Sequence, residues 1–161
     1  MEQKYQNKGK VAFLFKLSVF ILICHSQLFG QSWQEYKTEN LCTNRHENSM
    51  TCIGNQLVLV GGRKIKPVEV LDLKTNKWTK LTETPIEMHH FQAITFENEL
   101  WVLGAFTGQY PHEKPIEHIY IFNPVKNEWR KGAEIPKERN RGAAGVFVHN
   151  KKIYIVCGIK D

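Results

Sequence analysis

The chain has 161 residues, of which 42% are hydrophobic, and it carries a formal net charge of +6 at pH 7. Residues 1–30 hold four lysines and one glutamate, so +3 remains on the rest of the chain, where the basic residues are spread out. A small and scattered positive excess argues against a nucleic-acid partner, which would require a concentrated basic surface.

The first thirty residues have the pattern of a secretory signal peptide. A lysine-rich start precedes an apolar stretch over 11–24, and polar residues then lead to Gly30. This order predicts cleavage near Gly30 and a protein that is secreted or periplasmic. Lys16 interrupts the apolar stretch and leaves it shorter than the roughly 18–20 residues of a membrane span. An uncleaved membrane anchor is the rival interpretation, and no span is expected after cleavage.

Beyond this segment, an apolar strand pattern recurs at intervals of 43 and 53 residues. Each copy ends in small residues, and the copies occupy 57–62, 100–105 and 153–158. Self-similarity at such a period is typical of repeat architectures, in which each repeat forms one supersecondary unit.

The predicted strands are short, rich in β-branched and aromatic residues, and bounded by Gly, Asn, Pro or Lys, which favours antiparallel β-structure over helix. An isolated outer strand is expected around Trp33. Two complete four-stranded units and half of a third follow it, at 49–54, 57–62, 67–72 and 77–81, then 91–97, 100–105, 117–122 and 128–131, then 143–149 and 152–157.

Two further spacings support the same register. Arg45 and Arg141 each lie 12 residues before the first residue of the second strand, where the middle copy has Met88. A polar residue also precedes a tryptophan by six positions in two copies, as Asp72 precedes Trp78 and Asn123 precedes Trp129. The residues between them provide turn chemistry that reverses the chain.

Together these features resemble the kelch repeat, over roughly residues 33–158. The structural residues that carry the resemblance are Gly61, Gly62, Trp78, Gly104, Trp129 and Gly158. The resemblance implies an all-β propeller in which each tryptophan packs between adjacent sheets. The double glycine is intact only in the first copy, because Ala105 and Cys157 replace one glycine each in the other two.

Propellers close with roughly four to eight blades of four strands, and at a kelch period near 50 residues they need well over 200 residues. We therefore expect residues 31–161 to form an incomplete kelch-type propeller, the N-terminal part of a longer protein. The missing C-terminal part would supply the remaining blades. Closure by assembly with other chains is the alternative.

The resemblance also implies a binding face, where the loops joining strands 4 to 1 and strands 2 to 3 meet. The loop over 105–117 is eight residues longer than its counterpart in the first repeat, and long loops on rigid scaffolds often carry function. The candidate ligand-binding residues are Arg45, His89, His90, Tyr110, His112, Arg139 and Arg141. The alternative is that the arginines orient strands and the loop residues stiffen a surface turn.

No catalytic residue, cofactor or metal site is predicted. His89 and His90 are adjacent, and neighbouring side chains on a strand point to opposite faces, so they can share a metal only where the backbone is irregular. A disulfide between Cys42 and Cys52 is possible in an oxidising compartment. Cys157 stands in a glycine position and is expected to be a buried small residue.

The leading functional prediction is a secreted, non-catalytic module that binds a protein or a glycan. Two enzyme classes that resemble this arrangement stay open: a sialic-acid mutarotase or epimerase, and a copper oxidase of the galactose-oxidase kind. Adaptors of intracellular ubiquitin ligases also use kelch propellers, but the predicted export signal argues against that class.

Overall fold

The computed structural model describes residues 33–160, so the predicted signal peptide over 1–30 lies outside the described residues. The chain divides into two units, 1–36 and 37–161, and the second holds every strand of the described residues. The prediction of an outer strand around Trp33 is wrong, because residues 33–38 form no strand and the Trp33 side chain is fully exposed. That prediction assumed a neighbouring sheet, and a single strand is stable only within a ladder of backbone hydrogen bonds.

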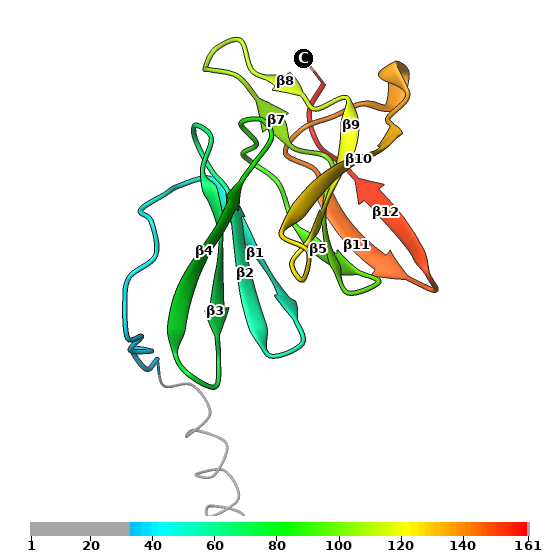
Figure 1. Cartoon of the computed structure of the whole chain (residues 1–161). Helices are drawn as coiled ribbons and strands as arrows, with labels where there is room; N and C mark the ends of the chain where they lie inside the picture. The colour runs from blue at the N-terminus through cyan, green and yellow to red at the C-terminus, as the bar shows by residue number, and fades with distance from the viewer. Residues whose placement is uncertain (1–32, 161) are drawn as a thin grey trace, which may run out of the picture. The chain divides into compact units, whose positions relative to one another are not determined.

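Blade one is the first four-stranded sheet of the second unit (Figure 1). Its strands β1 (Asn48–Ile53), β2 (Gln56–Gly61), β3 (Pro67–Asp72) and β4 (Lys77–Glu83) are antiparallel and lie in chain order. The inner strands read as continuous apolar runs because both faces of the sheet are covered. All four strands lie within about two residues of their predicted bounds.

Blade two repeats this arrangement with strands β5 (Ile94–Phe96), β6 (Glu99–Val102), β9 (His118–Asn123) and β10 (Glu128–Glu134), again with neighbours antiparallel. One feature was not predicted. The long loop between β6 and β9 contains a two-stranded sheet of its own, β7 (Phe106–Thr107) with β8 (Lys114–Pro115). The strands of this sheet are too short to show a period-2 sequence pattern.

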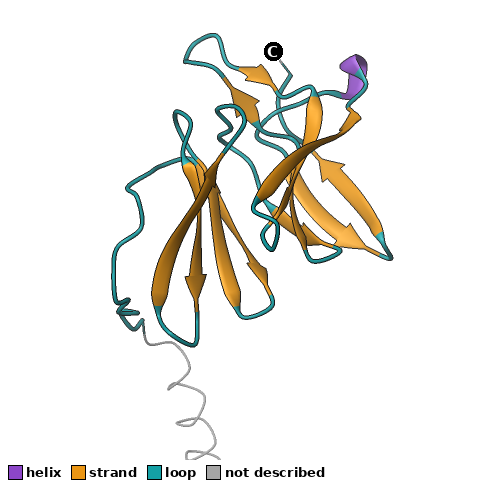
Figure 2. Cartoon of the chain, viewed as in Figure 1, coloured by secondary structure: helices purple, strands orange, loops and turns teal. Residues whose placement is uncertain are grey.

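Another two-stranded sheet ends the described chain, and we call it the third sheet because it follows blades one and two in the series of repeats. Strands β11 (Gly145–His149) and β12 (Lys152–Val156) pair as predicted, after a single 3-10 turn η1 (Lys137–Arg139). Figure 2 shows how strongly strands dominate, with η1 the one coloured helix in the described residues. The all-β prediction, with two complete blades and half of a third, is confirmed.

The blades are held together by two apolar cores. The larger lies between blades one and two and includes Val58, Val70, Leu100 and Phe122. Trp129 packs against this core, with its ring 5.1 Å from that of Phe122, as predicted for the strand-4 tryptophan. The smaller core joins blade two to the third sheet through Ile94, Leu103, Ile135 and Val146.

Steric crowding explains why β2 ends in glycine. Gly61 has φ 70°, and a Cβ there would lie 2.5 Å from the main-chain oxygen of Met88 in the next blade. Glycine alone combines positive φ with such close approach. Cys157 holds the equivalent place in the third sheet with φ 59°, but it is exposed, so its predicted burial is wrong. In the described residues β12 pairs with β11 alone, which leaves its other edge uncovered.

Cys42 and Cys52 are free thiols in the structure, and no disulfide forms between them. Within residues 33–160, no helix is long and apolar enough to cross a membrane.

Candidate functional site

The two ends of the propeller unit differ in construction. One end carries the connections β2–β3, β4–β5 and β6–β9, which rise together at the top of Figure 1, and we call it the loop face. The opposite end carries tight turns within each blade. The loop face is the side on which the resemblance placed ligand binding.

At the loop face, five charged and imidazole side chains from both blades meet. We call this set the loop-face cluster, and it consists of Glu47, Arg63, His89, His90 and Glu113. Arg63 is its centre. The Arg63 guanidinium forms ion pairs with Glu47 and Glu113 and donates a hydrogen bond to the Gly108 carbonyl at 3.1 Å. Because Gly108 and Glu113 belong to the β7–β8 connection, Arg63 ties that loop to blade one.

These ion pairs change the acid–base properties of the cluster. Burial opposes the effect, but the hydrogen bond from Arg63 and the nearby His90 hold the pKa of the Glu47 carboxyl below its ordinary value. Burial also opposes the shift at Arg63, yet its bonds to Glu113 and Glu47 raise the pKa of the guanidinium. The Glu47 carboxylate and the Arg63 guanidinium are therefore held in their charged forms.

His89 is the most enclosed member of the cluster, with a completely buried side chain. Its main chain exchanges two hydrogen bonds of 2.9 Å with Phe106 at the start of the hairpin. Its ring Nε2 lies 3.0 Å from the Gly108 carbonyl oxygen, and its Nδ1 lies 2.8 Å from Nδ1 of His90. Nε2 also lies 3.3 Å from Nη1 of Arg63, which only donates, whereas the Gly108 carbonyl only accepts. The two contacts require opposite tautomers. The shorter one, to Gly108, favours a proton on Nε2 and a lone pair on Nδ1.

The two adjacent histidines face each other because the backbone turns sharply between them. His90 has φ 50°, outside the strand region, so the alternation that would separate the two side chains does not apply. The sequence analysis expected the two histidines to share a metal only where the backbone is irregular, and the backbone is irregular at His90.

Glu47 was not among the predicted site residues. It precedes His90 by 43 residues, the repeat interval, and Ala143 follows His90 by 53. All three have positive φ, at 58°, 50° and 50°. The main chains of Glu47 and His90 are also joined by a 3.1 Å hydrogen bond. Aligning the repeats at His90 would have identified Glu47.

Arg45, a predicted ligand-binding residue, lies in the interior of blade one. Its side chain is 2% exposed and forms an ion pair with the fully buried Glu69. It also donates to the carbonyl oxygens of Gly61 at 3.1 Å and Thr43 at 3.3 Å. A ligand could reach Arg45 only by displacing these partners, so the contacts favour the structural alternative raised from the sequence.

The remaining candidates are distributed over the hairpin and the third sheet. Tyr110 and His112 lie at the exposed tip of the β7–β8 connection, with Tyr110 82% exposed. Arg139 is exposed in η1. Arg141 repeats the contacts of Arg45, donating to Cys157 O at 2.8 Å and to Arg139 O at 3.2 Å. Of the seven predicted residues, the structure brings together His89 and His90.

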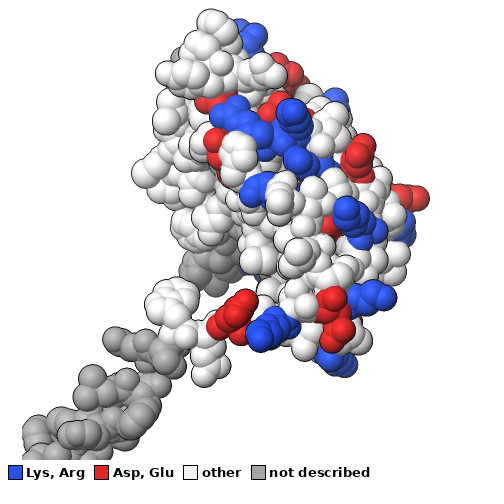
Figure 3. Space-filling model, turned by 90° about the vertical axis from the view of Figure 1, so that its left-hand side faces the viewer, with Lys and Arg blue, Asp and Glu red and all other residues white. Residues whose placement is uncertain are grey.

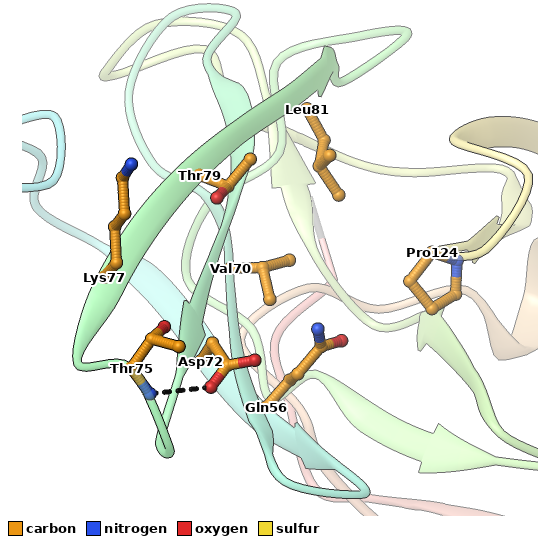
Figure 4. A pocket seen from close by; sticks show the side chains of 8 residues that line it. All are labelled: Gln56, Val70, Asp72, Thr75, Lys77, Thr79, Leu81 and Pro124. Atoms are coloured by element: carbon orange, nitrogen blue, oxygen red, sulfur yellow. Dashed lines mark hydrogen bonds between the residues drawn. The ribbon is translucent and has the colours of Figure 1, made fainter.

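A pocket of about 260 Å³ lies away from the loop face, beside the β3–β4 turn (Figure 4). Its walls come from blade one and from Pro124 of blade two. The carboxylate in it, Asp72, accepts hydrogen bonds from the main-chain nitrogens of Lys74 and Thr75 at 2.8 and 3.0 Å. That carboxylate is occupied in shaping the turn, so the pocket offers no pair of free acid and base groups.

Charges on the side of the molecule shown in Figure 3 are mixed. Acidic side chains stand among the basic ones, and Lys and Arg gather most closely toward the upper part of this view. The interspersed signs match the weak net charge of the chain and resemble an ordinary solvated surface.

The family model described as Kelch motif matches residues 44–85, which span blade one from the segment before β1 to the end of β4. Kelch-like protein 40 of Xenopus laevis is 29% identical over 115 residues. The chain therefore carries a Kelch motif in blade one and is similar to kelch-repeat proteins over most of its length. The human Kelch repeat and BTB domain-containing protein 12 is 26% identical over 136 residues.

The chain covers only a small part of these relatives. The match to the Xenopus protein takes in 71% of this chain and 18% of the relative, and the match to the human protein takes in 75% and 22%. The solved structure of YjhT matches with a TM-score of 0.63 at 19% identity, over 73% of this chain and 35% of that one. This likeness supports the kelch propeller fold and nothing about activity.

Proposed function

We propose that this chain is part of a kelch propeller that binds a protein segment through its loop face. Kelch proteins generally bind protein partners. The observation that supports the proposal most directly is the β7–β8 hairpin. It projects Tyr110 into solvent while its base is held by Arg63, through Gly108 and Glu113.

This construction has the physical properties of a binding loop. A tyrosine offers a large contact area with few rotatable bonds, and such residues often dominate interface energies. Anchoring the loop before binding reduces the entropy lost on association. His112 stands beside Tyr110 on the same tip and adds a polar contact.

The experiment tests the full-length protein for binding to two kinds of ligand. Random displayed peptides are selected for binding to it, and its binding to an array of neutral and acidic glycans is measured. We expect selected peptides to lose at least tenfold in affinity when Tyr110 and His112 are both changed to alanine. The matched control is Val125→Ala, since Val125 is 93% exposed in the turn between β9 and β10, away from the loop face.

Each outcome separates the alternatives. Glycan binding that the double substitution abolishes would replace the protein ligand by a sugar, as the sequence also allowed. Peptide binding lost in Val125→Ala but kept in the double variant would place the interface at the other end. No binding of either class by the native protein would overturn the proposal.

The two enzyme classes and the export of the protein stay predictions from the sequence. Accelerated exchange of sialic-acid anomers followed by NMR, or bound copper with a radical absorbance, would favour the corresponding enzyme. N-terminal sequencing of the natural protein tests export, since a mature chain that begins near residue 31 is expected.

A further inference from the structure

We propose that Glu47, His89 and His90 form a binding site for one divalent transition-metal ion of the zinc class. Each residue presents one donor atom, and the three donors lie within 4.8 Å of one another. The site lies where blades one and two meet on the loop face. It involves different side chains from the proposed peptide contacts at the hairpin tip, so either proposal can fail alone.

The separations of the donor atoms suit a single small ion. They are 2.8 Å between the two Nδ1 atoms, 3.4 Å from His90 Nδ1 to Glu47 Oε2, and 3.8 Å from His89 Nδ1 to the same oxygen. Zinc binds imidazole nitrogen and carboxylate oxygen at about 2.0–2.2 Å, which places tetrahedral ligands roughly 3.3 Å apart. The three separations bracket this value, so small side-chain rotations suffice.

The hydrogen bond on the far side of the buried ring supports the assignment. Metal-ligating histidines almost always donate their other ring N–H to a carbonyl or carboxylate, which fixes the tautomer. His89 Nε2 lies 3.0 Å from the Gly108 carbonyl oxygen, closer than the 3.3 Å to Arg63 Nη1, and as the donor to that carbonyl it leaves Nδ1 as the metal-binding lone pair. The buried ring cannot rotate freely, and its orientation is set before an ion arrives.

The local charges balance a divalent ion. Glu47, Glu113 and Glu87 all lie within 4.0 Å of a ring nitrogen of His89, and Arg63 pairs with the first two of them. With neutral imidazoles the set carries a net charge of −2. Arg63 contacts Glu47 Oε2, but a carboxylate oxygen has a second lone pair, so the guanidinium can hold the ligand without replacing the ion.

Two histidines and one carboxylate are a donor set typical of zinc and of other borderline divalent metals, and they leave a position open. His90 is 39% exposed and Glu47 26% exposed, so this position faces solvent. A water molecule or a side chain of a bound partner would complete the coordination there.

The test uses the full-length protein after a chelator has removed bound metal. The protein is titrated with Zn²⁺, followed by calorimetry, and separately with Co²⁺, followed by visible absorption. We expect one ion per chain, a visible Co²⁺ spectrum typical of tetrahedral coordination, and a higher melting temperature in the presence of Zn²⁺. His90→Asn and Glu47→Gln should each weaken Zn²⁺ binding at least tenfold. Asparagine accepts the positive φ of His90, so the backbone is preserved.

His149→Ala is the matched control, because His149 is exposed in β11, away from the loop-face cluster. It should bind Zn²⁺ as the native protein does. The proposal is overturned if the native protein binds no ion, if His90→Asn binds as tightly as native, or if His149→Ala removes binding to the same extent. Far-ultraviolet circular dichroism of each variant identifies a loss caused by misfolding, and Glu47→Gln then decides.

Discussion

Blades one and two fill the same interior position in opposite ways. In blade one, Glu69 lies opposite Leu59 in the sheet and pairs with Arg45. In blade two, Tyr120 lies opposite Val102 at the equivalent register, and Met88 replaces the arginine. The side chains at these two positions, Arg45 and Glu69 in blade one and Met88 and Tyr120 in blade two, are all almost completely buried. An ion pair in one repeat therefore corresponds to two members of the apolar core in the next.

This comparison shows that the fold requires the two buried side chains at this position to suit each other, and that it does not require either residue by itself. A buried charge without a partner is costly, whereas a complete pair and a well-packed apolar replacement can be similar in stability. The repeat therefore tolerates a change of both residues together. It also explains why the repeat arginine is absent from the middle copy while the blade is intact.

The largest expected effect comes from breaking the pair in blade one. Arg45→Met leaves the Glu69 carboxylate buried with Thr43 as its other hydrogen-bond partner, and we expect a loss of about 3–5 kcal/mol in the free energy of unfolding. Denaturant titration measures it. The double variant Arg45→Met with Glu69→Tyr copies blade two and should be more stable than Arg45→Met alone.

Arg130→Met is the control for this prediction. Arg130 is 51% exposed and pairs with Glu99, so its loss should cost about 1 kcal/mol or less. Equal losses from the two arginine substitutions would show that burial of the pair does not matter.

A smaller loss is expected at the close approach between the blades. Gly54→Ala should cost roughly 1–2 kcal/mol for its positive φ alone, since nothing lies within 4 Å of the added Cβ. Gly61→Ala has the same conformational cost, and its Cβ also meets the main chain of Met88, which should add about 1–3 kcal/mol. Thermal unfolding of the two variants measures the difference. Similar melting temperatures would mean that the blades separate easily at this point.

The smallest expected effect is a difference between the β3–β4 and β9–β10 turns in how their contribution to stability depends on pH. Asp72 and Asn123 each accept two main-chain hydrogen bonds at equivalent positions, but only Asp72 titrates. Those bonds, from Thr75 and Lys74, lower the pKa of Asp72 from 3.8. Its contribution to stability is therefore complete above pH 3.8 and is lost as the pH falls through the lower folded value.

Asp72→Asn should consequently reduce the acid sensitivity of folding, while Asn123→Asp should increase it. Urea unfolding at pH 6 and pH 3 measures both changes. If Asp72→Asn leaves the difference between the two pH values as it is in the native protein, the turn carboxylate contributes nothing to acid sensitivity.

The strand pattern could be predicted closely because its causes are local. Alternating turn residues and β-branched runs placed β1 through β4 within about two residues, and the Asp72 and Asn123 spacings located both turns. The β7–β8 sheet was missed because its two-residue strands show no period-2 pattern, and because the loop that carries them is held by Arg63 of blade one through Gly108. In the loop-face cluster, His89 and His90 were predicted as site residues, but Glu47, Arg63 and Glu113 were missed. Their meeting depends on contacts between repeats and on a backbone reversal at His90.

The sequence by itself determined that the described chain is built of kelch-type sheets, because hydrophobic period, glycine positions and turn residues act over a few neighbouring residues. Only the tertiary structure decided which side chains meet between the blades. Glu47 and His90 are 43 residues apart, and they become neighbours because equivalent positions of successive sheets converge on one face. Burial then decided that Arg45 stabilises a blade, while exposure left Tyr110 available to a partner.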